Sequence, residues 1–215
     1  MKIPSTIKIY KKNSYNLNAS NYIYKKILKC KNIVITSGNS IKGIYKYLDK
    51  KKIESKNFFL SDERIISYSS KYSNYKNLHK YNFLNKNNFN HFNICKKFKK
   101  SRTEKFFKNI NKKIDLSILS IGEGCHIASI FNIRNFNPSQ KYFNFKNSHD
   151  RVTIPLKIFN KSKKIIFLVK NKNRAKLLAH FYGKNLFIFK YLNKKKITFL
   201  FEEKTFKLFE KNLRQ

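Results

Sequence analysis

Residues 115–131 constrain the fold more than any other part of this sequence, because they join a buried-strand pattern to a glycine turn. Apolar residues over 116–121 lead directly into Gly122-Glu123-Gly124, then into His126 and a short segment of helical character. A strand that ends in a glycine turn and delivers polar side chains is typical of the carboxyl edge of an α/β sheet. We therefore expect a functional site at this turn.

The 215 residues, of which 41% are hydrophobic, are enough for one domain of ordinary size, so we expect a single domain over residues 1–215. The longest apolar run, 165–169, has the length of a strand rather than a membrane span. The first residues carry no signal-peptide pattern. Three widely spaced cysteines indicate a reducing compartment. We expect a cytoplasmic protein with no membrane partner, either a monomer or a homodimer.

The formal net charge of +38 would ordinarily indicate a polyanionic partner. Here only six of the 49 basic residues are arginine, and the lysines are spread over the whole chain. The abundant Lys, Asn, Ile, Phe and Tyr all have A/T-rich codons, which explains the composition without a ligand. Nucleic-acid-binding proteins instead concentrate their charge on one face and favour arginine. We therefore do not expect a nucleic-acid partner.

Strand and helix patterns alternate along the chain, which predicts an α/β fold: one Rossmann-like domain with a mostly parallel sheet flanked by helices. Residues 85–100 and 132–150 have no pattern and are expected to be loops. A helical turn is expected near Pro155. The expected strands are 7–10, 32–36, 57–60, 115–121, 165–169 and 197–201, and the expected helices are 21–28, 41–48, 75–84, 101–110, 171–182 and 202–213.

Three turns that follow expected strands, 37–40, 61–64 and 122–126, should meet at one edge of the sheet, together with Arg174 near a helix start. Together they supply free backbone N–H groups, arginines, carboxylates and one histidine. This set of groups suits a small phosphorylated substrate, whose phosphate binds arginines and turn amides. A plain strand–helix turn at 37–40 and a solvated ion pair at 61–64 are the structural alternatives.

Other chemistry finds less support in the sequence. The spacing of a P-loop, the dinucleotide-binding glycine pattern and any metal-ligand spacing are all absent, so we expect no cofactor and no metal. Cys125 is expected to be a small packing residue rather than a nucleophile. The remaining histidines, 79, 91, 149 and 180, are expected to be solvated.

Several segments resemble the 6-phosphogluconolactonase family in order and spacing. They are Ser61-Asp-Glu-Arg64, Ser73-Asn-Tyr75, Gly122 to Phe131, the Ser37-Gly38-Asn39-Ser40 turn, Arg151-Val-Thr153 and Phe167 to Ala175. The resemblance extends from about Ile33 to Ala175, and Thr198 to Glu202 is similar to the closing segment of the family.

The resemblance implies hydrolysis of 6-phosphogluconolactone to 6-phosphogluconate in the pentose phosphate pathway, without metal or cofactor. By position, His126 would be the general base that activates water at the lactone carbonyl. Asp62 and Glu123 would orient the histidine or line the sugar pocket. The 6-phosphate would be held by Arg64, Arg151, Arg174 and the turn residues Ser37, Gly38, Asn39 and Ser40.

The sequence also departs from the family. The aspartate two residues before the histidine is Gly124, the second glycine of the phosphate turn is Asn39, the Thr-Pro pair is Ile41-Lys42, and the helix lysine is Arg174. A base without its orienting carboxylate works less well, so we expect a reduced rate. Two alternatives stay open: a glucosamine-6-phosphate isomerase/deaminase type of enzyme, or a degenerate basic protein that binds RNA or an acidic partner. The former is disfavoured because no glutamate closely follows His126.

Overall fold

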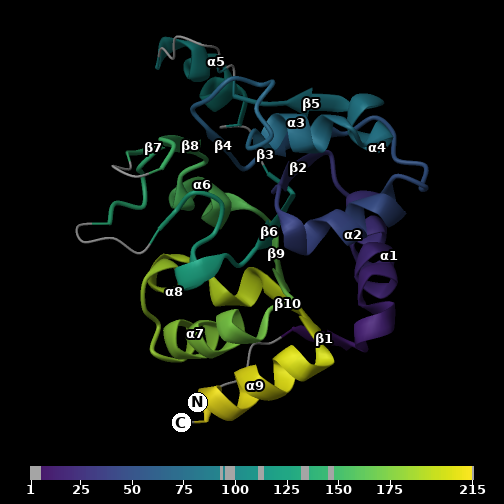
Figure 1. The fold of residues 1–215 in the computed structure, drawn as a ribbon, viewed down its shortest axis with the longest axis vertical. Coiled ribbons are helices and arrows are strands. Elements are labelled where there is room, and N and C mark those ends of the chain that lie inside the picture. The colour runs from purple at the N-terminus through teal and green to yellow at the C-terminus, as the bar shows by residue number, and fades with distance from the viewer. Residues whose placement is uncertain are drawn as a thin grey trace.

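A seven-stranded sheet forms the centre of the protein, and every pair of neighbouring strands in it is parallel (Figure 1). The computed structural model describes residues 6–92, 94, 100–110, 114–131, 136–144 and 148–214. The strands, in order across the sheet, are β1 (Ile7–Tyr10), β10 (Ile197–Glu202), β9 (Lys164–Val169), β6 (Leu116–Ser120), β2 (Asn32–Ile35), β3 (Asn57–Leu60) and β5 (Asn88–Asn90).

The order of these strands reverses at the boundary between β2 and β6. From β2 the chain proceeds to β3 and β5 on one side, whereas from β6 it proceeds to β9 and β10 on the other. The loops that leave β2 and β6 therefore diverge and open a crevice between them, which is where ligands bind in open α/β sheets. The predicted α/β architecture with a mostly parallel sheet is confirmed.

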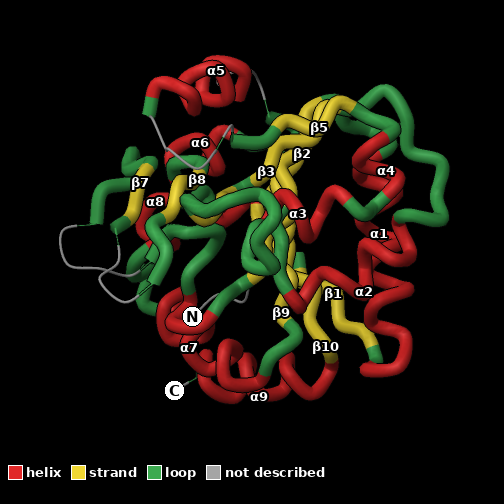
Figure 2. Tube along the Cα trace, turned by 45° about the horizontal axis from the view of Figure 1, so that its top comes forward, coloured by secondary structure: helices red, strands yellow, loops and turns green. Residues whose placement is uncertain are grey.

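Helices cover both faces of the sheet, with α1 and α2 on one side and α6, α7 and α8 on the other (Figures 1 and 2). The helices are α1 (Tyr15–Ile27), α2 (Asn39–Leu48), α3 (Asn74–His79), α4 (Asn82–Asn85), α5 (Ser101–Ile110), α6 (Leu156–Lys161), α7 (Lys172–Gly183), α8 (Ile188–Tyr191) and α9 (Glu203–Leu213). The short 3-10 turns are η1 (Lys12–Ser14), η2 (Glu123–Cys125) and η3 (Lys194–Lys196).

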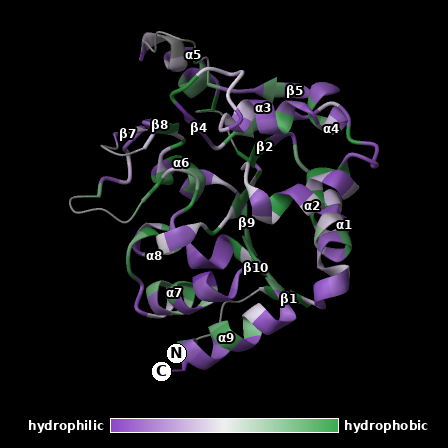
Figure 3. Cartoon of the chain, in the orientation of Figure 1, coloured by the Kyte–Doolittle hydropathy of each residue, from purple (hydrophilic) through white to green (hydrophobic). Residues whose placement is uncertain are grey.

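The central strands are mostly apolar because helices cover both of their faces. All six residues of β10 are buried, as are five of the six in β9. Phe167 of β9 stacks on Phe199 of β10 with ring centroids 5.5 Å apart. The hydropathy colouring shows central strands such as β9 and β10 in the hydrophobic colour and helices of mixed colour (Figure 3). This core fixes the strand ends that carry the site.

A second, three-stranded antiparallel sheet lies beside the first and corrects the interpretation of residues 61–64. Asp62–Arg64 is not a turn but the strand β4, which pairs with β8 (Arg151–Thr153), and β8 pairs in turn with β7 (Tyr142–Phe143). The pairing sets Arg64 directly opposite Arg151. A three-residue strand is too short to show a hydropathy period, so its non-local partner determines its structure.

The structure also differs from the expected bounds of two helices and from two expected loops. Helix α1 begins at Tyr15, six residues before the expected start at Asn21, and the expected helix 75–84 is divided into α3 and α4. Residues 85–100 contain β5, although 93 and 95–99 lie outside the described residues. The expected loop 132–150 contains β7, and 132–135 and 145–147 lie outside the description.

The segment after His126 is a tight turn rather than a helix. Ala128 has φ +49°, which an α-helix cannot accommodate, and Ile127 forms isolated bridges with Ile121 and Ile130. In the part of the chain that the structure describes, no helix is long and apolar enough to cross a membrane.

Candidate active site

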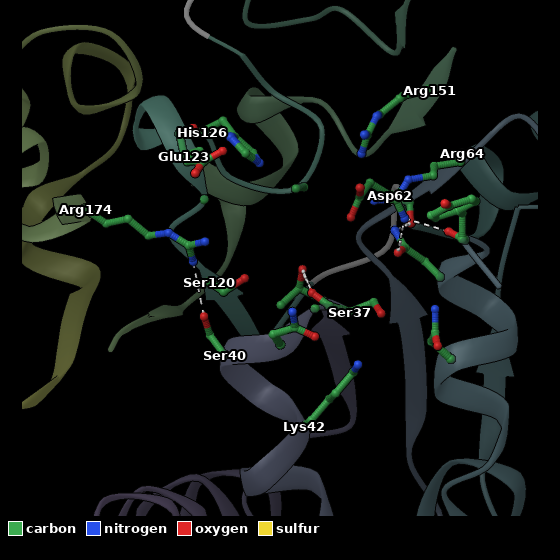
Figure 4. A pocket seen from close by; sticks show the side chains of 18 of the residues that line it. Ser37, Ser40, Lys42, Asp62, Arg64, Ser120, Glu123, His126, Arg151 and Arg174 are labelled. Atoms are coloured by element: carbon green, nitrogen blue, oxygen red, sulfur yellow. Dashed lines mark hydrogen bonds between the residues drawn. The ribbon is translucent and has the colours of Figure 1, made fainter. Parts of the chain in front are cut away.

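A cleft of about 520 Å³ opens where the strand order reverses, and segments that follow β2 and β6 line it (Figure 4). β4 and β8 contribute from one side, and the first turn of α7 contributes from another. The structure brings all the residues assigned from the sequence into this one cleft: Ser37, Gly38, Asn39, Ser40, Asp62, Arg64, Glu123, His126, Arg151 and Arg174. The three segments predicted to converge do so.

The loop after β6 is narrow and directs His126 into the cleft (Figure 4). The Gly122 N–H donates to the His126 carbonyl at 2.7 Å, which closes the loop. Within it, Gly124 has φ +62° and Cys125 has φ +63°. Glycine adopts this left-handed conformation at no steric cost, whereas Cys125 is held in it by a fully buried side chain. The turn is therefore rigid at its base.

The imidazole of His126 is oriented by the backbone. Its Nδ1 is hydrogen-bonded to the carbonyl oxygen of Glu123, and its ring stacks on Phe131 with centroids 4.5 Å apart. Burial lowers the pKa of His126, and Arg151 and Arg174 lower it further, whereas the Glu123 carbonyl and Asp62 raise it. The net shift is downward, so the neutral ring is favoured in the cleft.

Asp62 is a buried carboxylate that hydroxyl groups hold in place. Ser61 Oγ donates to Oδ1 at 2.7 Å, and Ser129 Oγ donates to Oδ2 at 2.6 Å. The Asp62 side chain is nearly inaccessible to solvent, yet it lines the cleft. Because hydroxyl donors occupy both oxygens, the carboxylate is kept in one orientation across the cleft from His126 (Figure 4).

Glu63, beside it, has a structural role. Its carboxylate accepts the backbone N–H groups of Asn74 and Tyr75, both at 2.7 Å, and the Ser73 hydroxyl at 3.0 Å. Burial raises the pKa of Glu63 despite these hydrogen bonds. Glu63 therefore fixes the start of α3 against β4, and it does not line the cleft.

Three arginines approach the cleft from different elements. Arg64 Nη1 donates to the Tyr72 carbonyl at 2.6 Å and to Asn74 Oδ1 at 3.2 Å. Arg151 lies over the Phe131 ring at 5.6 Å; burial, and then repulsion from Arg64, lowers its pKa. Two facing guanidinium groups repel each other, so an anion between them would be stabilised.

Arg174 joins α7 to the turn after β2. Its Nη1 donates to the Ile121 carbonyl at 2.9 Å and to Ser40 Oγ at 3.3 Å. Its buried Nε has no hydrogen-bond partner among the described residues. The N-terminus of α2 begins in the same turn, at Gly38, with no side-chain cap. Free N–H groups at a helix start, with an arginine beside them, suit a phosphate.

Glu123 was expected either to orient the histidine or to line the sugar pocket. Its exposed side chain lines the cleft, and its backbone carbonyl, rather than its carboxylate, contacts the imidazole. A local sequence pattern does not distinguish these two kinds of contact.

Nine further residues line the cleft without having been assigned a role from the sequence: Thr36, Lys42, Lys71, Tyr72, Asn74, Asn77, Ser120, Gly122 and Ala128. Lys42 and Lys71 gave no signal because lysine is abundant everywhere in this chain. Asn74 had one, because its segment Ser73-Asn-Tyr75 is part of the family resemblance; Ser73 is the N-cap of α3.

Cysteine and the remaining histidines lie outside the chemistry of the cleft. Cys125 is a packing residue as expected, since it is fully buried and burial raises the pKa of its thiol to about 12. His79, His149 and His180 are exposed. The expectation was wrong for His91, whose ring packs 4.1 Å from that of Tyr75 and whose Nδ1 lies 3.0 Å from the Tyr68 hydroxyl.

Comparison with known proteins places the chain in a family. The sequence model of one family, described as "Glucosamine-6-phosphate isomerases/6-phosphogluconolactonase", matches residues 18–186. A 6-phosphogluconolactonase of Thermotoga maritima is 27% identical over 159 residues, which cover 68% of this chain and 72% of that protein.

Solved structures show the same fold. A crystal structure of 6-phosphogluconolactonase from Thermotoga maritima has a TM-score of 0.79 and 22% identity and covers 92% of this chain and 98% of that one. A monomeric glucosamine-6-phosphate deaminase has a TM-score of 0.77 and 14% identity and covers 94% and 99%. The chain belongs to the glucosamine-6-phosphate isomerase/6-phosphogluconolactonase family.

Proposed function

We propose that the protein hydrolyses 6-phosphogluconolactone to 6-phosphogluconate, with His126 as the general base. The observation that carries this proposal is the hydrogen bond from His126 Nδ1 to the Glu123 carbonyl inside the cleft. Because a carbonyl oxygen can only accept, the proton resides on Nδ1, and the lone pair of Nε2 is free to accept a proton from water. The relative from Thermotoga maritima, which bears the name of this activity, supports the choice of substrate.

The reaction needs one base and a well-positioned substrate. Nε2 removes a proton from water as its oxygen attacks the lactone carbonyl carbon, which forms a tetrahedral intermediate. The intermediate collapses by breaking the bond to the ring oxygen, and that oxygen takes the proton back from the imidazolium. Asp62 lies close enough to favour the charged imidazolium while it exists. The lactone is an activated ester, so positioning and proton transfer supply most of what is required.

The charge of the cleft suits a phosphorylated substrate. Five cationic side chains line it, Lys42, Arg64, Lys71, Arg151 and Arg174, against the two carboxylates of Asp62 and Glu123. We assign the 6-phosphate to the end of the cleft formed by the turn Ser37–Ser40 and Arg174, with Arg64 and Arg151 on the facing wall (Figure 4). Lys42 reaches towards the same turn, and its ammonium has no hydrogen bond or ion pair among the described residues.

The deaminase reaction is the second candidate in the same family. Its ring-opening step uses a carboxylate that closely follows the histidine in the resemblance described above. Residues 127–131 here are Ile-Ala-Ser-Ile-Phe, which contain no carboxylate. The lactonase reaction does not require that group, and this difference favours it.

The test is turnover of freshly generated 6-phosphogluconolactone, followed by coupling to 6-phosphogluconate dehydrogenase and NADP. Gluconolactone without the phosphate, followed by the release of acid, and glucosamine 6-phosphate, followed by the release of ammonia, serve as comparison substrates. We expect hydrolysis above the spontaneous rate for the phosphorylated lactone alone. Release of ammonia from glucosamine 6-phosphate would favour the second candidate, and no turnover of either would leave a basic protein without this chemistry.

A further inference from the structure

The aspartate that the family carries two residues before its histidine is Gly124 in this chain, and nothing takes its place there. A Cβ built on Gly124 would meet no atom within 4 Å, although the φ of +62° would strain any other residue placed there. A catalytic histidine ordinarily needs a partner that fixes its tautomer and its orientation. Other parts of the loop must supply both if His126 is the base.

The tautomer is fixed by the backbone. The Glu123 carbonyl accepts from Nδ1, and the same carbonyl lies 3.4 Å from the His126 backbone nitrogen, which donates to it. The Gly122 N–H donates to the His126 carbonyl at 2.7 Å, so the accepting carbonyl and the imidazole belong to one closed turn. A backbone carbonyl on Nδ1 is an accepted alternative to a carboxylate for setting the histidine tautomer.

Two neighbours restrict the orientation of the ring. The imidazole stacks on Phe131, with centroids 4.5 Å apart and an angle of 29° between the planes. Gly122 also approaches the ring so closely that an added Cβ would lie 2.2 Å from both Cε1 and Nε2. The ring therefore occupies a narrow slot that only glycine at position 122 leaves open.

We infer that Gly122, Phe131 and the Glu123 carbonyl position His126 as the Nδ1–H tautomer and together replace the missing carboxylate, so that this chain needs no acid at position 124. Gly122 and Phe131 are positioning residues that act through His126. The inference rests on the proposed function for its catalytic consequence, but the tautomer and the slot can be tested without turnover.

The charged side chains around the imidazole also affect the pKa of His126. Asp62 on β4 favours the charged imidazolium, and Arg151 on β8 and Arg174 on α7 oppose it. The Glu123 side chain, on the same turn, also lines the cleft. An acid at position 124 would add one negative charge to this set and would raise the pKa of His126.

The kinetic test compares Phe131→Leu, Phe131→Tyr and Gly124→Asp with wild type. Phe206→Leu on α9, a partly buried phenylalanine remote from the cleft, is the matched control. We expect Phe131→Leu to lower kcat about tenfold with KM within about threefold, because the ring loses its stacking face while substrate binding stays. Phe131→Tyr should retain activity, and Phe206→Leu should match wild type.

Gly124→Asp is the most informative variant. We expect it to change kcat by less than about threefold at neutral pH, because the imidazole is already positioned. The added negative charge should shift the acid limb of the kcat profile to higher pH. A gain of about tenfold or more would overturn the inference by showing that the missing acid is a lesion. Equal losses in Phe131→Leu and Phe206→Leu would also overturn it.

A spectroscopic test separates this inference from the proposed function. Long-range ¹H–¹⁵N correlation spectra report which imidazole nitrogen is protonated, and the His126 signals are identified by their loss in His126→Ala. We expect the Nδ1–H form in wild type and a mixture of tautomers in Phe131→Leu and Gly122→Ala. If the protein showed these tautomers but no turnover, the inference about His126 would stand and the proposed lactonase activity would be wrong. The Nε2–H form in an active wild type would overturn the inference.

Discussion

At the scale of single residues, His126 differs from an ordinary surface histidine because its surroundings keep the ring neutral. Burial is the main cause of its lowered pKa, and the two nearby arginines add to it. A general base must be deprotonated to act, so the same surroundings that remove water also keep the base in its active form. The position of His126 at a strand end could be predicted from the sequence, but the shift in its pKa could not, because its main cause is burial, which depends on how the whole cleft packs.

The pH dependence of turnover follows from the direction of this shift. With a folded-state pKa below the ordinary histidine value of about 6.5, the neutral base persists into weakly acidic solution. We expect kcat/KM for the lactone to stay flat through neutral pH and to fall only as pH drops through the lowered pKa. Stopped-flow rates across the acid range would check this, and an acid limb centred above the ordinary value would contradict it.

At the scale of elements, the strand–helix turns were predictable and the second sheet was not. The turn 37–40 and the loop 122–126 follow strands with clear apolar patterns, and both lie at the predicted edge. The strand β4 has three residues, all of them charged, and only its pairing with β8 makes it a strand. That pairing joins residues almost ninety positions apart, which no local pattern reveals.

The first turns of α2 give a test of the phosphate end of the cleft. Lys42 lines the cleft, whereas Lys46, one turn further along the same helix, does not. We expect Lys42→Gln to raise the KM for the phosphorylated lactone by about threefold to tenfold with little change in kcat. Lys46→Gln controls for the loss of one positive charge from the helix. Equal effects of the two variants on KM would show that only overall charge matters.

Asp115 links three strands at the opposite edge of the sheet. Its carboxylate accepts the backbone N–H groups of Lys31 and Asn32 at 2.9 and 3.0 Å and pairs with Lys163 at 2.7 Å. Burial opposes ionisation, but Lys163 and the two N–H groups outweigh it, and the pKa of Asp115 is lowered.

We expect Asp115→Asn to reduce the free energy of unfolding by about 1.5–3 kcal/mol at neutral pH, the usual value for hydrogen bonds to a charged group. A carboxylate with a lowered pKa stabilises the fold above its unfolded-state pKa of about 3.9 and loses that contribution as pH falls through the lowered value. Urea unfolding of both proteins at neutral and acidic pH should show the difference narrowing in acid. A difference that does not change with pH would argue against the ionic contribution.

At the scale of the whole molecule, the charge of +38 is distributed rather than concentrated on one element. The five ion pairs among the described residues each use a lysine or arginine, and four of them join largely exposed side chains. Such pairs contribute little to stability, so most of the positive charge remains uncompensated in the fold. The composition therefore carries little information about function, and the few residues that depart from it, Gly122, Gly124, Asp62 and Arg174, carry much more.

Self-repulsion of this charge predicts an unusual response to salt. Raising NaCl from about 0.05 to about 0.5 M shortens the Debye length from more than 10 Å to a few Å and screens like charges. We expect Tm to rise with NaCl, as measured by scanning calorimetry. A fall in Tm would indicate that ion pairs outweigh repulsion.

The most direct test of the account is the hydrolysis of 6-phosphogluconolactone by wild type and by His126→Ala, measured side by side after subtraction of the spontaneous rate. We expect turnover by wild type and a loss of at least about 100-fold in His126→Ala, with both proteins folded. Turnover by wild type that survives in His126→Ala would contradict the assignment of the base, and no turnover by wild type would contradict the proposed function itself.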